Sequence, residues 1–565
     1  MMRHDDPAVR AALAEAFGFD DLRPMQADAI DAVLAGRDVL LTLPTGGGKS
    51  LAFQLPALVL DGLVLVISPL IALMKDQVDG LRAKGVRAAY VNSLVSAPDR
   101  RKRLEAAANG ELDLLYVTPE RFRSPTFLEL LPRMNVVRFA VDEAHCISQW
   151  GHDFRPDYSR LAIARRLAGD PPAIALTATA TPRVATDIAE RLELRDPVIL
   201  RAGIERPNLF LASTRVVTDD EKLDLLEARL KQLNGAGIVY GALIKDLEFY
   251  AGELARRGLK TLVYHGGLSG RERRAMQERF MASDDAVVLA TNAFGMGVDK
   301  ADIRFVLHTQ VPRTLEAWTQ EVGRAGRDGA PSYCELLYFE QDLAIQETFV
   351  RWANPTLEYM VGLFETLKGW GERLQVKDVD DLRQELLVKE RRDNRVGICL
   401  RWLEVLGITQ GSFETHDLEL VRDLDPNELP EFFGTGDKLK DDLTGLLTMA
   451  RFAGDELTCR RTLLADHFEL EGPSEPCGAC DVCTNGSTWR AAHFNGRTTD
   501  GDAGLAQDRD GAFQRGDWVK VGRHLGQVVQ VQGEGKRVML TVESASDLRR
   551  RKVNPAKQRV ERLDS

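Results

Sequence analysis

Short apolar runs recur along the first part of the chain, and each one ends in small polar or charged residues. They occupy residues 38–42, 63–67, 114–117, 136–141 and 173–176. Segments with helical patterning separate them, so the pattern indicates a parallel sheet with helices on both faces. Ligands of such sheets bind at the carboxyl ends of the strands, which is where the polar clusters fall.

The same alternation returns further along the chain, at residues 237–240, 259–264, 286–291 and 303–308. We therefore predict two tandem α/β lobes, over 1–205 and 206–350. Only the first lobe carries a glycine-rich phosphate loop.

This glycine-rich turn follows the first apolar run and opens into a predicted helix. It consists of Thr45, Gly46, Gly47, Gly48, Lys49 and Ser50. Between a strand and a helix, the backbone N–H groups of such a turn can cradle a phosphate, with Lys49 on the terminal phosphates and Ser50 on magnesium. Leu43 stands where the strict pattern has glycine, so a turn without any ligand is the alternative.

Two adjacent carboxylates, Asp142 and Glu143, follow the apolar run at 136–141. A carboxylate at a strand end that faces a phosphate loop can hold Mg²⁺, and a neighbouring Glu can orient the attacking water. Two solvated acidic residues are the alternative, which the phosphate loop on the same sheet disfavours.

Three motifs resemble those of the superfamily-two helicases: Gly-Lys-Ser at 48–50, Asp-Glu-Ala-His at 142–145 and Thr-Ala-Thr at 177–179. Residues 145–156, His-Cys-Ile-Ser-Gln-Trp-Gly-His-Asp-Phe-Arg-Pro, resemble the aromatic-rich loop of the RecQ helicases. Trp150 and Phe154 offer π-faces to unstacked bases, and Arg155 adds a charge or a stacking plane. An aromatic core cluster is the alternative, but it leaves the intervening polar residues unexplained.

The resemblance implies that both lobes are RecA-like and clamp ATP and Mg²⁺ between them. Phe19, Arg23 and Gln26 match the family's adenine-binding motif. Leu22 departs from that motif, where an aromatic residue is usual, and 240–245 lacks the usual polar pair. The implied DNA contacts are Ser68, Thr118, Trp150, His152, Phe154 and Arg155.

Residues 294–299 and 320–329 resemble two further helicase motifs, which place Asp299 at the nucleotide and two arginines opposite it. An arginine from the second lobe neutralises charge on the transferred phosphoryl group only when the cleft closes. We expect Arg327 to be this arginine finger and Arg324 its neighbour. Two solvated arginines on a glycine-rich loop are the alternative.

The region 351–455 has mixed patterning. Helices are predicted over 378–390 and 396–407, and a hairpin is predicted from 408–413 and 418–421. This order fits a winged-helix module, and a plain helical spacer fits it equally well. In RecQ helicases the winged helix follows the cysteines, so its place here would be a departure.

Four of the seven cysteines lie close together in the chain, within the predicted subdomain 456–485: Cys459, Cys477, Cys480 and Cys483. Two overlapping Cys-x-x-Cys steps and a distant cysteine form a tetrahedral thiolate site for Zn²⁺, and they resemble the RecQ zinc subdomain. Four protein ligands leave no open position, so the predicted role is structural. A disulfide-exchange pair is the alternative.

Residues 486–511 are polar and rich in glycine, which is typical of a linker. Beyond them, 512–565 carries short alternating runs with tight turns, which predict a small SH3-like β-barrel. Its basic end at 549–552 either contacts phosphates or is a solvated edge strand.

The bulk composition of the 565 residues, 44% of them hydrophobic, is typical of several globular domains. No apolar run reaches the roughly 18 residues of a membrane span. The first residues lack the apolar core of a signal peptide, so we expect a cytoplasmic protein, nucleoid-associated if bacterial. The net charge of −11 does not indicate DNA binding, although a basic groove is compatible with it.

Together these features predict an ATP-dependent DNA helicase that, by the family resemblance, moves 3′ to 5′ and acts in repair and recombination. The expected partners are single-stranded and tailed duplex DNA, with a single-strand-binding protein as a further candidate. A DNA-stimulated translocase that displaces proteins without separating strands is the alternative among enzymes. An architectural adaptor whose ATP site only sets its conformation is the alternative among binding proteins, which the set Lys49, Glu143 and Arg327 disfavours.

Overall fold

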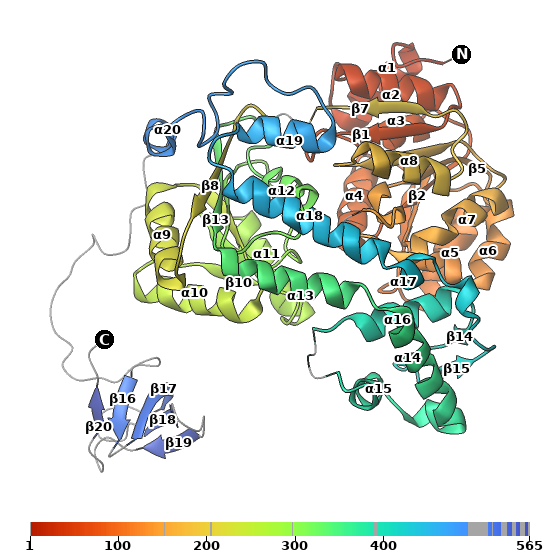
Figure 1. Cartoon of the computed structure of the whole chain (residues 1–565). Coiled ribbons are helices and arrows are strands. Elements are labelled where there is room, and N and C mark those ends of the chain that lie inside the picture. Colours follow the sequence, from red (N-terminus) through yellow and green to blue (C-terminus); the bar gives the residue numbers. More distant parts are fainter. Residues whose placement is uncertain are drawn as a thin grey trace. The chain divides into compact units, whose positions relative to one another are not determined.

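A computed structural model describes residues 2–151, 153–203, 206–295, 298–388, 390 and 392–494, together with the backbone of five strands between 518 and 562 (Figure 1). The chain divides into two units, 1–499 and 500–565. Among the described residues, no helix combines the length and the apolar character that crossing a membrane requires.

The first lobe is built on a seven-stranded parallel sheet in the order β3-β4-β2-β5-β6-β1-β7. Its strands are β1 (Val39–Thr42), β2 (Leu63–Ile67), β3 (Ala88–Val91), β4 (Leu114–Val117), β5 (Val136–Val141), β6 (Ala173–Thr177) and β7 (Val198–Arg201). The five predicted strands are confirmed. The two that lie outside the predicted set, β3 and β7, are the two edges of the sheet.

Helices cover both faces of this sheet, and a buried apolar cluster lies on each side of it. They are α1 (Pro7–Ala12), α2 (Pro24–Leu34), α3 (Leu51–Ala57), α4 (Ile71–Ala83), α5 (Ala97–Ala108), α6 (Pro125–Leu130), α7 (Leu161–Leu167) and α8 (Pro182–Arg191). The sheet therefore presents its carboxyl ends as the accessible edge, as the sequence pattern predicts.

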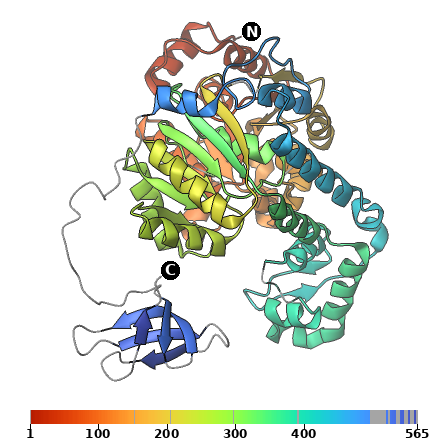
Figure 2. The same ribbon diagram turned by 60° about the vertical axis from the view of Figure 1, so that its left-hand side comes forward.

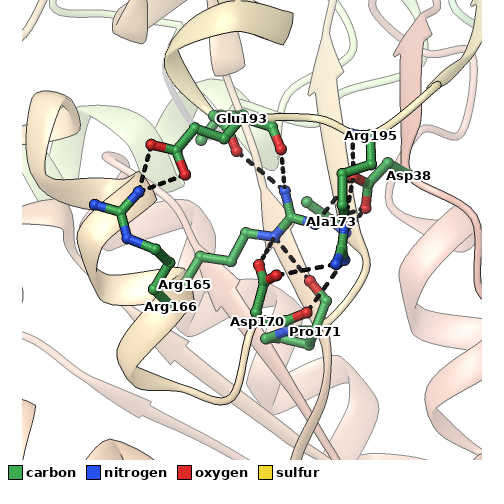
Figure 3. Close-up of polar contacts among 9 residues, drawn as sticks. Asp38, Arg165, Arg166, Asp170, Pro171, Ala173, Glu193 and Arg195 are labelled. Carbon is green, nitrogen blue, oxygen red and sulfur yellow. Dashed lines mark hydrogen bonds and ion pairs between the residues drawn. The ribbon is translucent and has the colours of Figure 1, made fainter.

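A buried ion pair links α7 to the start of β1, at the amino-terminal ends of the strands (Figure 3). Arg165 donates to both carboxylate oxygens of Asp38, at 2.8 and 2.9 Å, and each side chain is almost fully buried. Asp38 also accepts from the backbone N–H groups of Ala173, at 2.7 Å, and Arg195, at 2.6 Å. Because the carboxylate is surrounded by donors, its charge is satisfied away from water.

The second lobe has a six-stranded parallel sheet in the order β10-β11-β9-β12-β13-β8. Its elements are β8 (Leu209–Arg215), α9 (Asp219–Gln232), β9 (Ala236–Tyr240), α10 (Ile244–Arg256), β10 (Leu262–Tyr264), α11 (Gly270–Met281), β11 (Val287–Ala290), β12 (Ile303–His308), α12 (Leu315–Val322) and β13 (Ser332–Tyr338). The four predicted strands are confirmed. Two strands lie outside the predicted set, β8 at the edge of the sheet and β13 beside it. β13 contains the buried Glu335, whose carboxylate is paired with Arg229 at 2.6 Å and interrupts the apolar pattern.

Two helices lead away from the second lobe and back to it, α13 (Leu343–Ala353) and α18 (Asp437–Gly454). They pack side by side in both views (Figure 2), and Asn354 after α13 donates to Asp442 of α18 at 2.7 Å. After α18 come Cys459, α19 (Arg460–Phe468) and the other three clustered cysteines. They share a core with the second lobe and with α18, where the ring of Phe452 lies 4.8 Å from that of Trp318.

Between α13 and α18 lies a small separate core, which we call the inserted module (residues 357–435). It contains α14 (Leu357–Trp370), α15 (Val379–Glu385), α16 (Arg395–Val405), β14 (Thr409–Gln410), β15 (Glu419–Leu420) and α17 (Phe432–Thr435). The predicted antiparallel hairpin is confirmed. The helix predicted over 378–390 stops at Glu385, because Leu387 adopts a left-handed φ of 55°.

The predicted linker at 486–511 begins too early. Helix α20 (Gly486–His493) occupies its start, and Trp489 packs against Phe210 at 4.8 Å between ring centres. Arg490 donates to the hydroxyl of Tyr333 at 2.5 Å. Trp489 and the buried Phe494 thus anchor on the second lobe a segment whose composition is otherwise that of a linker.

The C-terminal unit has five antiparallel strands in the order β19-β18-β17-β16-β20. They are β16 (Trp518–Val521), β17 (His524–Gln532), β18 (Met539–Ser544), β19 (Arg550–Val553) and β20 (Val560–Arg562). The described residues of this unit form strands, as predicted, and closure into a barrel stays a prediction.

Candidate functional site

The glycine-rich turn after β1 forms a compact loop that closes against α2. Gly46 and Gly48 adopt left-handed φ values of 81° and 75°, which side-chain-bearing residues rarely take. A Cβ on Gly48 would lie 2.3 Å from Nε2 of Gln26. That amide donates to the carbonyls of Gly47, at 3.1 Å, and Gly48, at 3.3 Å. The loop therefore requires glycine and is held from the side by Gln26.

Lys49 and Ser50 lie at the end of this loop with their polar atoms on protein partners. The Lys49 ammonium donates to the carbonyl of Leu43 at 3.1 Å, and Gln77 of α4 donates to the Ser50 hydroxyl at 3.2 Å. Burial lowers the pKa of Lys49, while the charges of Glu143 and Asp142 oppose that shift. A bound phosphate would give the Lys49 ammonium a charged partner in place of the neutral carbonyl of Leu43.

Asp142 and Glu143 face this loop from the end of β5. Glu143 takes a left-handed φ of 48°, and its N–H donates to Asp142 at 3.0 Å. Burial and then the neighbouring Glu143 raise the pKa of Asp142 to about 7, against the effect of Lys49. A buried carboxylate next to a like charge favours a cation, so Asp142 fits a Mg²⁺ ligand, with Ser50 as a further one.

The two lobes enclose a cavity of about 210 Å³ between the phosphate loop and the arginine motif. Its lining includes Lys49, Asp142 and Glu143 from the first lobe and Asp299, Arg324 and Arg327 from the second. Arg327 pairs with Asp299, and Arg324 donates to the carbonyl of Gly295. The Nε atoms of both arginines and Oε2 of Glu143 are buried without a hydrogen bond, which leaves polar groups for a phosphate chain and a water.

The predicted adenine-binding residues lie beside the loop. Arg23 reaches the carbonyl of Gly46 at 3.5 Å, and its own N–H donates to Gln26 at 3.1 Å. The side-chain amide of Gln26 is therefore already hydrogen-bonded to the glycine-rich loop and to the start of α2. Phe19 is 53% exposed, so its ring face is open for stacking.

The aromatic-rich loop begins directly after Glu143. Arg183 of α8 lies over the ring of Trp150 at 3.6 Å, and Asp441 of α18 holds Arg183 at 2.5 Å. Phe154 is half-buried, and Arg155 pairs with Asp153 at 2.9 Å. His152 lies outside the described residues. The ring of Phe154 lies against that of Trp402 in α16, so both aromatic side chains have protein partners.

The other two predicted DNA contacts are hidden at strand ends. Ser68 is 1% exposed and lies beside Asp142, and Thr118 is 7% exposed. Neither offers an exposed hydroxyl in this arrangement of the lobes. The remaining contacts predicted on this edge therefore belong to the aromatic-rich loop.

The four cysteines converge, with all sulfur atoms within 4.8 Å of one another. The Sγ atoms of Cys459 and Cys480 are 3.9 Å apart, close to the roughly 3.8 Å edge of a tetrahedron with Zn–S bonds of about 2.3 Å. Burial opposes ionisation of Cys459, but the N–H groups of Thr462 and Arg461 lower its pKa to about 6. The cluster fits zinc in a structural role.

Two further residues join the lobes or hold the site, and the sequence analysis misses them. Arg206 donates to the carbonyls of Thr45, at 3.3 Å, and Gly323, at 3.1 Å, and so bridges the phosphate loop and the arginine motif. Gln77 holds Ser50 from α4. Neither lies in a recognisable motif, and only the three-dimensional arrangement reveals them.

Comparison with known families agrees with this architecture. Residues 23–188 match the DEAD/DEAH box helicase model, 221–329 the helicase conserved C-terminal domain and 428–484 the RecQ zinc-binding domain. Residues 330–427, between the helicase C-terminal match and the zinc-binding match, are not covered by these three models. This stretch includes nearly all of the inserted module.

Several curated proteins are similar over long stretches. The probable ATP-dependent DNA helicase RecS of Bacillus subtilis is 42% identical over 67% of this chain and 76% of its own length. The ATP-dependent DNA helicase RecQ of Synechocystis is 36% identical over 85% of this chain and 99% of its own length. RecQ of B. subtilis is 44% identical over 60% of this chain and 58% of its own.

Among solved structures, the DUF1998 helicase MrfA bound to DNA matches 75% of this chain and 64% of its own, with a TM-score of 0.50 and 18% identity. That likeness supports the paired-lobe fold. The matched zinc-binding domain and the identity to full-length relatives show more: the chain belongs to the RecQ family of superfamily-two helicases.

Proposed function

We propose that this protein is an ATP-dependent DNA helicase that moves 3′ to 5′ along single-stranded DNA and separates duplex strands. The observation that carries the proposal is the cavity between the lobes, where Lys49, Glu143 and Arg327 meet from opposite sides. A site made from two lobes couples hydrolysis to their closure. The proposed setting is repair and recombination.

In this proposal Lys49 neutralises the terminal phosphates and Glu143 orients the attacking water, while Arg324 and Arg327 balance charge on the transferred group. Mg²⁺, held by Ser50 and Asp142, would supply further charge neutralisation at the phosphates. Phe19, Arg23 and Gln26 would contact the adenine, and Asp299 would position Arg327.

The proposed DNA contacts are Trp150, His152, Phe154 and Arg155 of the aromatic-rich loop, with Ser68 and Thr118 becoming available when the lobes move. Stacking on aromatic faces suits single strands of any sequence. We further propose an SH3-like barrel for the C-terminal strands and a single-strand-binding protein as a partner.

The test is the ATPase rate with and without single-stranded DNA, together with fluorescent strand separation on duplexes with a 3′ or a 5′ tail. Stimulation with unwinding of the 3′-tailed duplex is the expected result. Stimulation without unwinding would favour the translocase alternative, and preference for the 5′ tail would refute the polarity. A rate indifferent to DNA would remove the proposal.

A further inference from the structure

The inserted module docks on the first lobe at the stem of the aromatic-rich loop. Arg123 of the first lobe pairs with Asp157 and also with Glu404 of α16, each at 2.5 Å. Arg160 donates to the backbone carbonyls of Glu404, at 3.1 Å, and Val405, at 2.6 Å. Two arginines therefore bind the C-terminal end of one helix, where carbonyl groups and the helix dipole attract cations.

Phe154 of the loop joins the apolar core of the module. Its ring stacks on Trp402 of α16, with centres 6.1 Å apart and planes at 25°, and meets Phe432 edge-on at 6.4 Å. Trp402 is 6% exposed, so this contact lies at the edge of a packed core. The ring face of Phe154 that stacks on Trp402 is closed to a DNA base while it remains there.

Short backbone contacts connect this docked side chain to the hydrolysis site. The N–H of Arg155, next to Phe154, donates to the carbonyl of Cys146 at 2.9 Å. The N–H of Cys146 in turn donates to the carbonyl of Glu143 at 2.9 Å. These two hydrogen bonds form a short backbone route from the residue next to Phe154 to Glu143.

We propose that Trp402, Glu404 and Phe432 are positioning residues that hold the aromatic-rich loop in a DNA-free, low-activity position. DNA must withdraw Phe154 from the inserted module before it can stimulate hydrolysis. The inference rests on the proposed function, since it requires DNA to act through this loop. Because only part of the protein has the loop released, the apparent affinity for DNA is reduced by that fraction.

The test compares the wild-type protein with the double variant Glu404→Gln/Phe432→Leu, which weakens the docking contacts and leaves Trp402 in its core. We expect ATP hydrolysis without DNA to rise by about fivefold or more, and the single-stranded DNA concentration for half-maximal stimulation to fall by a similar factor. The maximal DNA-stimulated rate should stay the same. Amide exchange in 150–160 should quicken in the variant and, on adding DNA, in the wild type.

The matched control is Glu428→Gln, because Glu428 pairs with Arg422 inside the module at 2.5 Å and makes no ion pair with the described residues of the first lobe. It should behave as the wild type. Unchanged basal rate and DNA dependence in the double variant would overturn the inference, as would a loss of stimulation at an unchanged basal rate. A wild-type protein that DNA does not stimulate would instead refute the proposed function, and the inference with it.

Discussion

At the scale of single residues, the hydrolysis site depends on a carboxylate whose backbone is set in a left-handed turn. Oε2 of Glu143 is buried without a hydrogen bond and lies 3.4 Å from His145. Replacing Glu143 with Gln removes the charge that polarises water and keeps the shape. We expect kcat for ATP hydrolysis to fall by about 10²- to 10⁴-fold while nucleotide binding persists.

Turnover and binding of a fluorescent ATP analogue measure these two effects separately. Glu120→Gln is the matched control, since Glu120 follows β4 on the same sheet but is exposed. A Glu143→Gln protein that hydrolyses ATP at the wild-type rate would disprove the assigned role.

Arg327 makes a second residue-scale prediction. Burial lowers its pKa, although Asp299 opposes the shift, and one of its nitrogens is buried without a partner. Arg327→Ala should reduce kcat by about 10³-fold or more, and Arg327→Lys should not restore it because lysine lacks the planar fork. Arg351→Ala, an exposed ion-pair arginine on α13, is the control. Full activity of the lysine variant would show that charge alone suffices.

How much of the site could be predicted follows from where its residues lie. Lys49, Asp142 and Arg327 belong to contiguous motifs, and the structure brings these three around one cavity. Gln77 and Arg206 act through single contacts with the loop, so no local pattern marks them. Phe154 has an aromatic partner 248 residues away in the chain, which local sequence reasoning cannot detect.

At the scale of elements, the buried Asp38–Arg165 ion pair anchors α7 to the sheet at the start of β1. Arg165→Met removes the closest cation from the buried Asp38 carboxylate and leaves two backbone N–H donors and the more distant Arg195, so it should destabilise the first lobe by about 3 kcal/mol. The neighbouring Arg166→Met breaks the exposed pair with Glu193 and should leave stability nearly unchanged, because solvent screens that pair. Amide exchange of β1 and β6 measures the difference. Equal protection in both variants would contradict it.

The elements themselves were predictable where burial is complete. Strands such as β2 and β4, which lie inside the sheet, are continuous apolar runs. The edge strand β7 ends in Arg201, and β13 contains Glu335, whose buried charge is paired with Arg229. The inserted module was recognisable as helices and a hairpin, but its docking on the first lobe depends on contacts between distant segments.

At the scale of the whole molecule, the cysteine cluster completes the second lobe. The N–H of Leu211 on β8 donates to the carbonyl of Ala479 at 3.0 Å, and Asp481 accepts from Ser213 at 2.8 Å. Cys480→Ser should abolish stoichiometric zinc binding and lower the midpoint of thermal unfolding, because metal binding contributes folding free energy.

Zinc content by mass spectrometry and calorimetry check this prediction. Cys399→Ala is the control, since Cys399 is a buried cysteine of the inserted module outside the cluster. A Cys480→Ser protein with full zinc content would mean that the metal, if bound, is held elsewhere.

The pairing of β8 with residues near 480 also has a consequence for protein synthesis. The first lobe takes all its strands from residues 39–201 and can fold as soon as these have left the ribosome. The second lobe is different, because the partner of Leu211 is translated 269 residues later. At about 5–20 residues per second, the edge of that nascent sheet stays uncovered for on the order of 10 to 50 seconds, during which it needs shielding from other chains.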